Sequence, residues 1–200
     1  MGPMSAPISA SLPGERTTLT AEDWEQAALG LIAEKGVGGL AVEPLARRLG
    51  ITKGSFYWHF SSRADLLCRA LSRWEEQDAQ HIDLALSADL APARRLAEFV
   101  RRTSRQNLTH RVYAALCAAP ENDRVRPVLQ RVTTRRIQRL TGAFAELGLD
   151  AADASHRARL TYSAYMGYLQ LEAQGTMPGR DGPEFGDYVE HVIRALVDQA

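Results

Sequence analysis

The sequence predicts an all-α protein of about nine helices, with a helix-turn-helix domain at its amino terminus followed by a larger helical body. Apolar residues recur at steps of three and four along most of the chain, and no segment alternates apolar and polar residues over a useful length. Apolar residues make up 45% of the chain and charged residues 24%, as in ordinary globular proteins. No uncharged apolar run reaches the length of about 18 residues that a transmembrane helix needs.

Four helices are expected before residue 75, of which the second and third are short and the fourth is long. The first opens at the possible cap Thr20 and stops at Gly36. The second is brief and ends at Gly50, which can take the left-handed conformation of a tight turn. Thr52 is expected to cap a third helix that runs to about residue 59, and Ser62 to cap a long fourth one.

Five more helices are expected beyond residue 75. They run over about 92–108, 112–117, 125–147, 152–174 and 183–197. We expect residues 1–14 to form a disordered arm, 15–70 the helix-turn-helix domain and 71–200 the helical body.

The expected cellular location is the cytoplasm. Residues 1–14 lack the basic start and apolar stretch of a secretion signal. The two cysteines, Cys68 and Cys117, lie in apolar helical patterns without metal-ligand partners at useful spacing. We expect both to be small buried thiols.

The net charge of zero conceals a local basic patch. Between Arg47 and Arg63 the chain has four cations and a histidine but no acidic residue, whereas Glu15 to Glu43 contains six acidic residues. Such a patch concentrates positive potential and favours contact with a polyanion such as DNA.

Residues 40–60 read as a helix, a short turn containing glycine, and a second helix, the geometry that places a helix in the DNA major groove. Apolar residues are placed to hold the two helices together, and they include Leu45, Ala46 and Phe56. The second helix carries an outward set of polar and aromatic residues that is unusual for a surface exposed only to water. The predicted DNA-contacting residues are Arg47, Thr52, Lys53, Gly54, Ser55, Tyr57, Trp58, His59 and Arg63.

Each residue type suits a different contact. Thr52 and the backbone amides beside it can hold a phosphate, and Gly54 allows close approach. Lys53, Ser55 and Trp58 can face base edges or thymine methyl groups. Tyr57 and His59 can bind phosphate oxygens, which position a protein without reading sequence.

Simpler interpretations stay open for several of these residues. The alternative for Tyr57 is a core position, and the alternative for Lys53 and Arg63 is an ordinary solvated surface. For Arg47 and Arg48, exposure to water alone and contact with the DNA backbone are equally good interpretations.

The segment from about Thr20 to Leu71 resembles the DNA-binding domain of the TetR family. The resemblance rests on Leu45-Ala46, on Leu49-Gly50-Ile51-Thr52-Lys53-Gly54-Ser55-Phe56-Tyr57, on His59-Phe60, and on Arg63 followed by Asp65-Leu66-Leu67. The sequence departs from the family pattern at Ala41, where threonine is frequent, and at Trp58, where histidine or arginine is. The resemblance implies a homodimeric regulator, more often a repressor, that binds a palindromic operator and is released by a small molecule.

The last two helices are the expected dimer interface. The helix over 152–174 carries more apolar surface than one monomer core is expected to cover. A four-helix bundle across a two-fold axis would use this surplus, although the same faces can also be satisfied within one monomer. The predicted interface residues are Ala164, Gly167, Leu171, Phe185, Val189, Val192 and Leu196.

An effector cavity is expected in the body, with apolar walls and a few polar groups. Its candidate lining residues are Phe99, Thr103, Gln106, Tyr113, Cys117, Ile137, Phe144, Tyr162 and Met166, most of which fit a packed core equally well. The arginines between Arg94 and Arg139 suit an acidic ligand or, more simply, a solvated face.

Two other classes of function were weighed against a DNA-binding regulator. The five histidines are scattered over different helices, and the sequence has no nucleophile elbow, phosphate loop or metal motif, so we expect neither an enzyme nor a cofactor. A helical protein whose amino-terminal domain binds another protein is the remaining alternative. Alanine at Tyr57 and Lys53 distinguishes it, because only a DNA-binding protein would lose DNA affinity while its dimer stays intact.

Overall fold

The computed structural model describes residues 19–87, 89–105, 107–180 and 182–197. These residues form only helices and their connections, which confirms the all-α prediction. The elements are α1 (Ala21–Lys35), the short 3₁₀ helix η1 (Val37–Gly39), α2 (Val42–Arg48), α3 (Lys53–Phe56), α4 (Arg63–Leu86), α5 (Pro92–Ser104), α6 (Asn107–Cys117), α7 (Val125–Ala145), α8 (Ala151–Ala173) and α9 (Pro183–Leu196). The expected arm, residues 1–14, lies outside the described residues.

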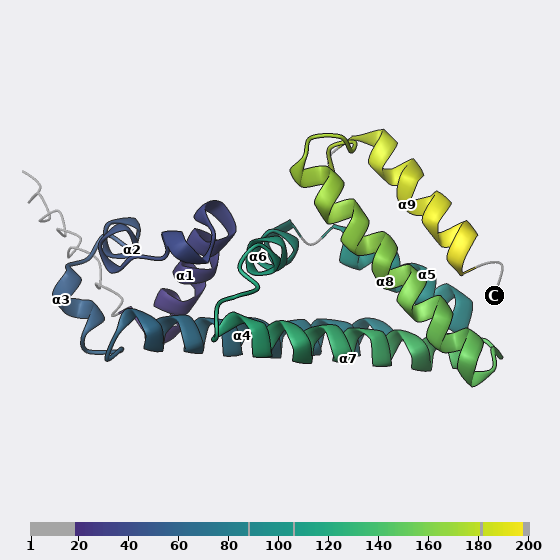
Figure 1. The fold of residues 1–200 in the computed structure, drawn as a ribbon, viewed down its shortest axis with the longest axis horizontal. Helices are drawn as coiled ribbons and strands as arrows, with labels where there is room; N and C mark the ends of the chain where they lie inside the picture. Colours follow the sequence, from purple (N-terminus) through teal and green to yellow (C-terminus); the bar gives the residue numbers. More distant parts are fainter. Residues whose placement is uncertain (1–18, 88, 106, 181, 198–200) are drawn as a thin grey trace, which may run out of the picture.

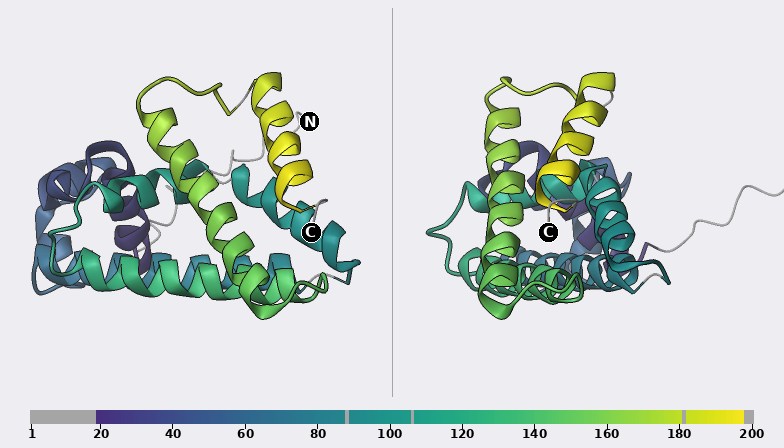
Figure 2. Two further views of the ribbon diagram at one scale, coloured as in Figure 1. Left: turned by 45° about the vertical axis from the view of Figure 1, so that its right-hand side comes forward. Right: turned by 90° about the vertical axis from the view of Figure 1, so that its right-hand side faces the viewer.

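The molecule is elongated, with α1, α2 and α3 at one end and α5, α8 and α9 at the other (Figure 1). Helices α4 and α7 lie side by side along its length, and α1 packs on α4. Helices α8 and α9 rise away from the α4–α7 pair (Figure 2). We call α1 to α3 with the start of α4 the head, and α5 to α9 with the rest of α4 the body.

Local signals in the sequence set the helix ends of the head. Thr20 and Asp23 form a capping box, in which the Thr20 amide donates to the Asp23 carboxylate at 2.7 Å and the Asp23 amide donates to the Thr20 hydroxyl. Gly36 and Gly50 both have positive φ, at 72° and 69°, and each follows a helix as expected. The hydroxyl of Thr52 makes no capping bond, so that prediction was wrong.

Helix α4 belongs to both ends of the molecule. The hydroxyl of Ser62 accepts from the Asp65 amide at 3.1 Å and caps it as predicted. The helix then runs without a break through residue 70, the predicted domain boundary. The proposed DNA-binding domain and the proposed sensing domain therefore share one rigid element.

Ion pairs join α4 to α7 along their length. Arg131 pairs with the buried Glu75 at 2.6 Å, and Arg136 pairs with the buried Asp78 at 2.6 Å. In the Arg136–Asp78 pair both side chains are buried, so removing one partner leaves an uncompensated charge, which typically costs about 3–5 kcal/mol. These pairs fix the register between the two long helices.

Two further details of the structure differ from the sequence prediction. Cys68 is exposed, because it lies on the side of α4 opposite to the buried Leu66, Leu67 and Ala70, while Cys117 is partly buried. Helix α7 ends at Ala145 rather than Leu147, and the positive φ of Gly148 follows in the turn. No helix among the described residues is both long and apolar enough to cross a membrane.

Candidate nucleic-acid interface and ligand cavity

Phe56 anchors the short helix α3 to the head. Its ring is buried and meets Trp24 edge-on at 5.4 Å between centroids, and it stacks on Phe60 at 5.4 Å. Leu45 and Ala46 are buried below it on α2. Because Phe56 is inserted into the core, the opposite side of α3 faces outward.

The residues around Phe56 form an exposed surface of cationic and aromatic side chains. Trp58 is 88% exposed and Tyr57 61% exposed, which disagrees with a core position for Tyr57. Lys53 is exposed, and no carboxylate in the described part of the chain forms an ion pair with it. We call Lys53, Tyr57 and Trp58 the recognition surface. Large exposed aromatic residues beside a cation suit contact with base edges and phosphates.

The other predicted contact residues are placed less uniformly. Thr52 and Gly54 are exposed beside the recognition surface, and Ser55 and His59 are partly buried. A Cβ atom at Gly54 would meet only the Thr52 hydroxyl, at 3.7 Å, so the space there is open on the outer side. The α-helical part of this segment has four residues, Lys53–Phe56, which is shorter than predicted.

The three arginines of the patch all have partners within the chain. Arg47 pairs loosely with Glu43 on the surface at 3.6 Å, and Arg48 donates to Glu34 at 2.6 Å. Arg63 donates to the backbone carbonyls of Val37, the first residue of η1, and Leu40, the residue after it. Arg63 therefore holds the connection before α2 in place, a role that the sequence did not reveal. Its contact with DNA stays a prediction for the N–H groups that remain.

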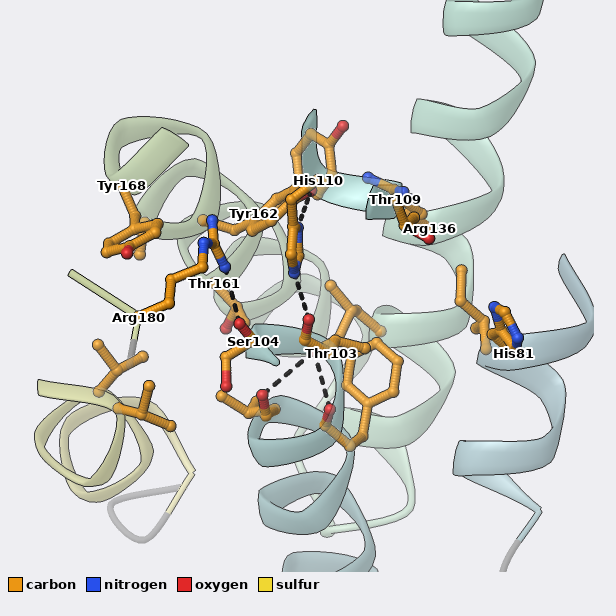
Figure 3. A pocket seen from close by; sticks show the side chains of 18 of the residues that line it. His81, Thr103, Ser104, Thr109, His110, Arg136, Thr161, Tyr162, Tyr168 and Arg180 are labelled. Atoms are coloured by element: carbon orange, nitrogen blue, oxygen red, sulfur yellow. Dashed lines mark hydrogen bonds between the residues drawn. The ribbon is translucent and has the colours of Figure 1, made fainter. Parts of the chain in front are cut away.

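The body contains a cavity of about 120 Å³ between α4, α5, α6, α7, α8 and α9 (Figure 3). Three of the predicted ligand residues, Phe99, Thr103 and Tyr162, line it. Its remaining lining residues are Asp78, His81, Ile82, Val100, Ser104, Thr109, His110, Arg136, Leu140, Thr161, Ala164, Tyr165, Tyr168, Arg180, Phe185, Tyr188, Val189 and Val192.

The other predicted ligand residues are absent from the cavity lining. Tyr113 and Phe144 are buried in the core, and Cys117, Ile137 and Met166 pack against it. Gln106 lies outside the described residues. Residues that pack in the core and residues that line a cavity recur with the same helical period. Spacing alone therefore did not separate core residues from cavity-lining residues.

A hydrogen-bonded chain runs along one wall of the cavity. His110 Nδ1 lies 2.8 Å from the Tyr165 hydroxyl, and its Nε2 contacts the Thr103 carbonyl (Figure 3). The guanidinium of Arg136 lies over the ring of Tyr165, 5.6 Å from its centroid, and binds Asp78 through two nitrogens. The wall therefore combines residues of five helices, α4 to α8, in one polar network.

Burial sets the ionisation of this network. It lowers the pKa of His110 from 6.5 to about 4, and the positive charge of Arg180 acts in the same direction. Burial also raises the pKa of the Tyr165 hydroxyl to about 12. At neutral pH the imidazole and the phenol are both uncharged.

A second buried arginine closes the other side of the cavity. Arg180 binds Glu172 at 2.6 and 2.7 Å and donates to the Ser104 carbonyl at 2.7 Å. Its guanidinium also covers the Tyr168 ring at 4.7 Å. It thus joins the loop after α8 to the end of α5.

Sequence reasoning missed His110, Arg136, Tyr165 and Arg180. One signal was present: Arg136 interrupts the apolar stripe between Val132 and Leu140, which are buried one turn to either side. A charged residue in such a stripe must have a buried partner, but Asp78 lies 58 residues earlier in the chain.

Most of the predicted dimer residues face the interior of the chain itself. Phe185, Val189 and Leu196 are buried within the single chain, so their part in an interface between two chains stays a prediction. Amphipathic spacing predicts that one face of a helix is buried, but it does not predict whether the same chain or a partner buries it. In this structure α5 packs on α9.

The apolar surface that remains lies on α8. Ala164 and Val192 line the cavity, whereas Gly167 and Leu171 are exposed. Leu160, which was not predicted, is 55% exposed one to two turns before Gly167, and Leu171 is 42% exposed. We call Leu160, Gly167 and Leu171 the α8 face.

Comparison with known proteins gives independent matches to the head and to the fold. The model of the family "Bacterial regulatory proteins, tetR family" matches residues 26–70. The tetracycline repressor protein class A from transposon 1721 of Escherichia coli is 48% identical over 42 residues, which are 21% of this chain and 19% of that repressor. The matched segment thus spans about a fifth of its curated relative.

Solved structures extend the likeness of fold over the body. A TetR transcriptional regulator from Legionella pneumophila aligns with a TM-score of 0.73 and 17% identity, covering 92% of this chain and 98% of that one. A transcriptional regulator from Rhodococcus sp. Rha1 aligns with a TM-score of 0.71 and 21% identity, covering 90% and 95%. Residues 26–70 therefore match the TetR family, and the chain shares the fold of these solved regulators over about nine-tenths of its length.

Proposed function

We propose that this protein is a cytoplasmic transcription regulator, more specifically a repressor, that binds a palindromic DNA operator as a homodimer and is released by a small molecule in its body cavity. The observation that carries the proposal is the recognition surface: Lys53 on α3 and Tyr57 and Trp58 in the turn after it are exposed, while Phe56 between them is buried in the core. A rigid, exposed group of this composition has the size to read a few base pairs in one major groove.

Lys53 and Tyr57 are expected to make different contributions to DNA binding. Lys53→Ala should remove about one phosphate neutralisation if it binds the backbone, which lowers the slope of log affinity against log salt by about 1. If it reads a base edge, discrimination at one position should relax instead. Tyr57→Ala should weaken binding to all sequences, since a phosphate contact carries no sequence information.

The experiment begins with sequences selected from a random DNA pool, followed by fluorescence anisotropy at several salt concentrations. The matched control is Arg102→Ala, which removes an exposed cation in the body. Saturable, sequence-selective binding that is reduced by the two head variants and unchanged by Arg102→Ala supports the proposal. Binding that is absent, or equal for all sequences, contradicts it.

A dimer is needed because one short helix reads too few base pairs, and two copies can match a two-fold operator. The α8 face supports the assignment of the interface to α8, since two large apolar residues lie exposed there on either side of a glycine. Leu160→Glu is expected to convert the dimer to monomer in light scattering after size exclusion. Leu84→Glu is the control, because Leu84 is 70% exposed on α4. An unchanged mass for the Leu160 variant would move the interface elsewhere.

Repression and release are tested together with a promoter reporter. The selected operator is placed between the promoter and the reporter gene, and the wild-type protein should lower its output. An increase in output would instead identify an activator. Release is expected through a population shift, since a ligand that favours one spacing of the two heads disfavours operator binding at another.

A further inference from the structure

The walls of the cavity are rich in aromatic rings. Phe99, Tyr162, Tyr165, Tyr168, Phe185 and Tyr188 all line it, and they come from α5, α8 and α9. The volume of about 120 Å³ is close to that of an engineered protein cavity of about 150 Å³ that binds benzene. The cavity therefore has room for one aromatic ring.

The charges at the cavity are already paired inside the protein. Arg136 binds Asp78 through two nitrogens, and Arg180 binds Glu172 through two nitrogens. An anionic ligand would have to compete with these carboxylates for the same guanidinium groups. A cationic ligand would face two arginines. Either ion would also lose its hydration in a mostly apolar space, which costs several kcal/mol.

Three hydroxyl groups on the walls offer oxygen lone pairs to a ligand because their protons are already used. Thr103, Ser104 and Thr161 each donate to a backbone carbonyl of their own helix, at 2.8, 2.8 and 2.9 Å. A hydroxyl has one proton and two acceptor sites, so each can accept a further hydrogen bond. The cavity is suited to a ligand that donates.

Both ring nitrogens of His110 are also used in contacts within the protein. The Thr103 carbonyl can only accept, so the proton of the neutral imidazole lies on Nε2 and Nδ1 accepts from the Tyr165 hydroxyl. The imidazole therefore has no free proton for a ligand.

From these observations we propose that the cavity binds an uncharged, single-ring aromatic molecule that carries one hydrogen-bond donor, and phenol is the simplest example. The ring lies among the aromatic walls, and the donor bonds to the Thr161 hydroxyl or to a neighbouring acceptor. This inference rests on the proposed function in that the bound molecule is the effector that releases DNA.

The test uses calorimetric titration of the full-length wild-type protein with four probes of similar size. Phenol is expected to bind at least about tenfold more tightly than benzoate, benzylammonium or cyclohexanol, which change the charge or remove the aromatic ring. Equal or tighter binding of benzoate or benzylammonium overturns the claim that the ligand is uncharged. Equal binding of cyclohexanol overturns the claim that it is aromatic. Absence of phenol binding overturns the whole inference.

Two variants place the binding site. Val192→Phe fills the cavity from α9 and should weaken phenol binding at least about tenfold, whereas Ala195→Phe adds a ring on the exposed side of the same helix and should not. Thr161→Val removes an acceptor and should weaken binding about three- to tenfold. Its control is Thr141→Val, because Thr141 makes the same bond to its own helix, at 2.9 Å, but does not line the cavity.

Circular dichroism of each variant identifies loss of fold, and the Thr161 pair decides the result if the Val192 variant does not fold. Equal phenol affinity in the folded Thr161 and Thr141 variants would overturn the assigned acceptor. Operator binding is measured without phenol in parallel. Selective DNA binding without phenol binding refutes only the ligand class, whereas phenol binding without DNA binding refutes only the proposed function.

Discussion

Acid should destabilise this protein through His110 in a way that one substitution can isolate. The folded chain keeps the imidazole neutral, since burial lowers its pKa to about 4 from an ordinary 6.5. Between these two values the unfolded chain binds more protons than the folded one. The free energy of unfolding therefore has its full value above pH 6.5 and falls as the pH falls through 6.5 toward 4.

The magnitude follows from the two pKa values. At 1.36 kcal/mol for each pKa unit, the complete effect is about 3 kcal/mol, of which about 2 kcal/mol is lost between pH 7 and pH 5. His110→Gln keeps a donor and an acceptor in the side chain but cannot be protonated. The variant should therefore lose about 2 kcal/mol less than wild type over the same pH step.

Urea unfolding at pH 7 and pH 5 measures this difference, with the fluorescence of the buried Trp24 and Trp74 as the probe. One fixed protein concentration is used, since self-association contributes to apparent stability. The matched control is His191→Gln, which replaces an exposed histidine on α9 and should keep the wild-type response. If wild type and His110→Gln lose the same stability, the imidazole is not held neutral by its surroundings.

Three further substitutions test the packing described above. Arg63→Ala should lower the free energy of unfolding by about 1 kcal/mol, because the Leu40 carbonyl loses its donor. The loss is measured as a lower urea midpoint, and an unchanged midpoint would show that this contact adds nothing to stability. Asp78→Asn should cost about 3–5 kcal/mol by leaving Arg136 without a counter-charge, as measured by thermal and urea unfolding, and a loss below 1 kcal/mol would mean that water solvates the arginine. Phe56→Ala should cost about 3–5 kcal/mol and abolish operator binding, and a variant that retains full DNA affinity would show that the ring does not position the recognition surface.

The head could be read from the sequence because its signals are local. Thr20 caps α1 through a residue three positions away, and Gly50 has the positive φ that its turn requires. Phe56 was expected in the core from its spacing and bulk, and it is fully buried there. The roles of Lys53 and Trp58 toward DNA stay predictions, although both side chains are exposed as those roles require.

The body was predictable as helices but not as a site. The cavity wall joins Asp78, His110, Arg136 and Tyr165 from four helices, and no short-range pattern reports such contacts. The α9 part of the dimer interface stays a prediction for a related reason. The hydrophobic period identified the buried side of Phe185 correctly, but it carried no information on which helix would cover it.

The uninterrupted helix α4 has a mechanical consequence. About 15 residues of α4 separate Arg63, at the head, from Asp78, at the cavity wall. With a rise of 1.5 Å per residue, this part of α4 is about 22 Å long. A tilt of about 5° about the Asp78 end would displace the Arg63 end by about 2 Å, which is comparable to the reach of one hydrogen bond. In the proposed dimer, such a displacement of each head would change the spacing of the two recognition surfaces and so weaken their fit to successive turns of a DNA duplex.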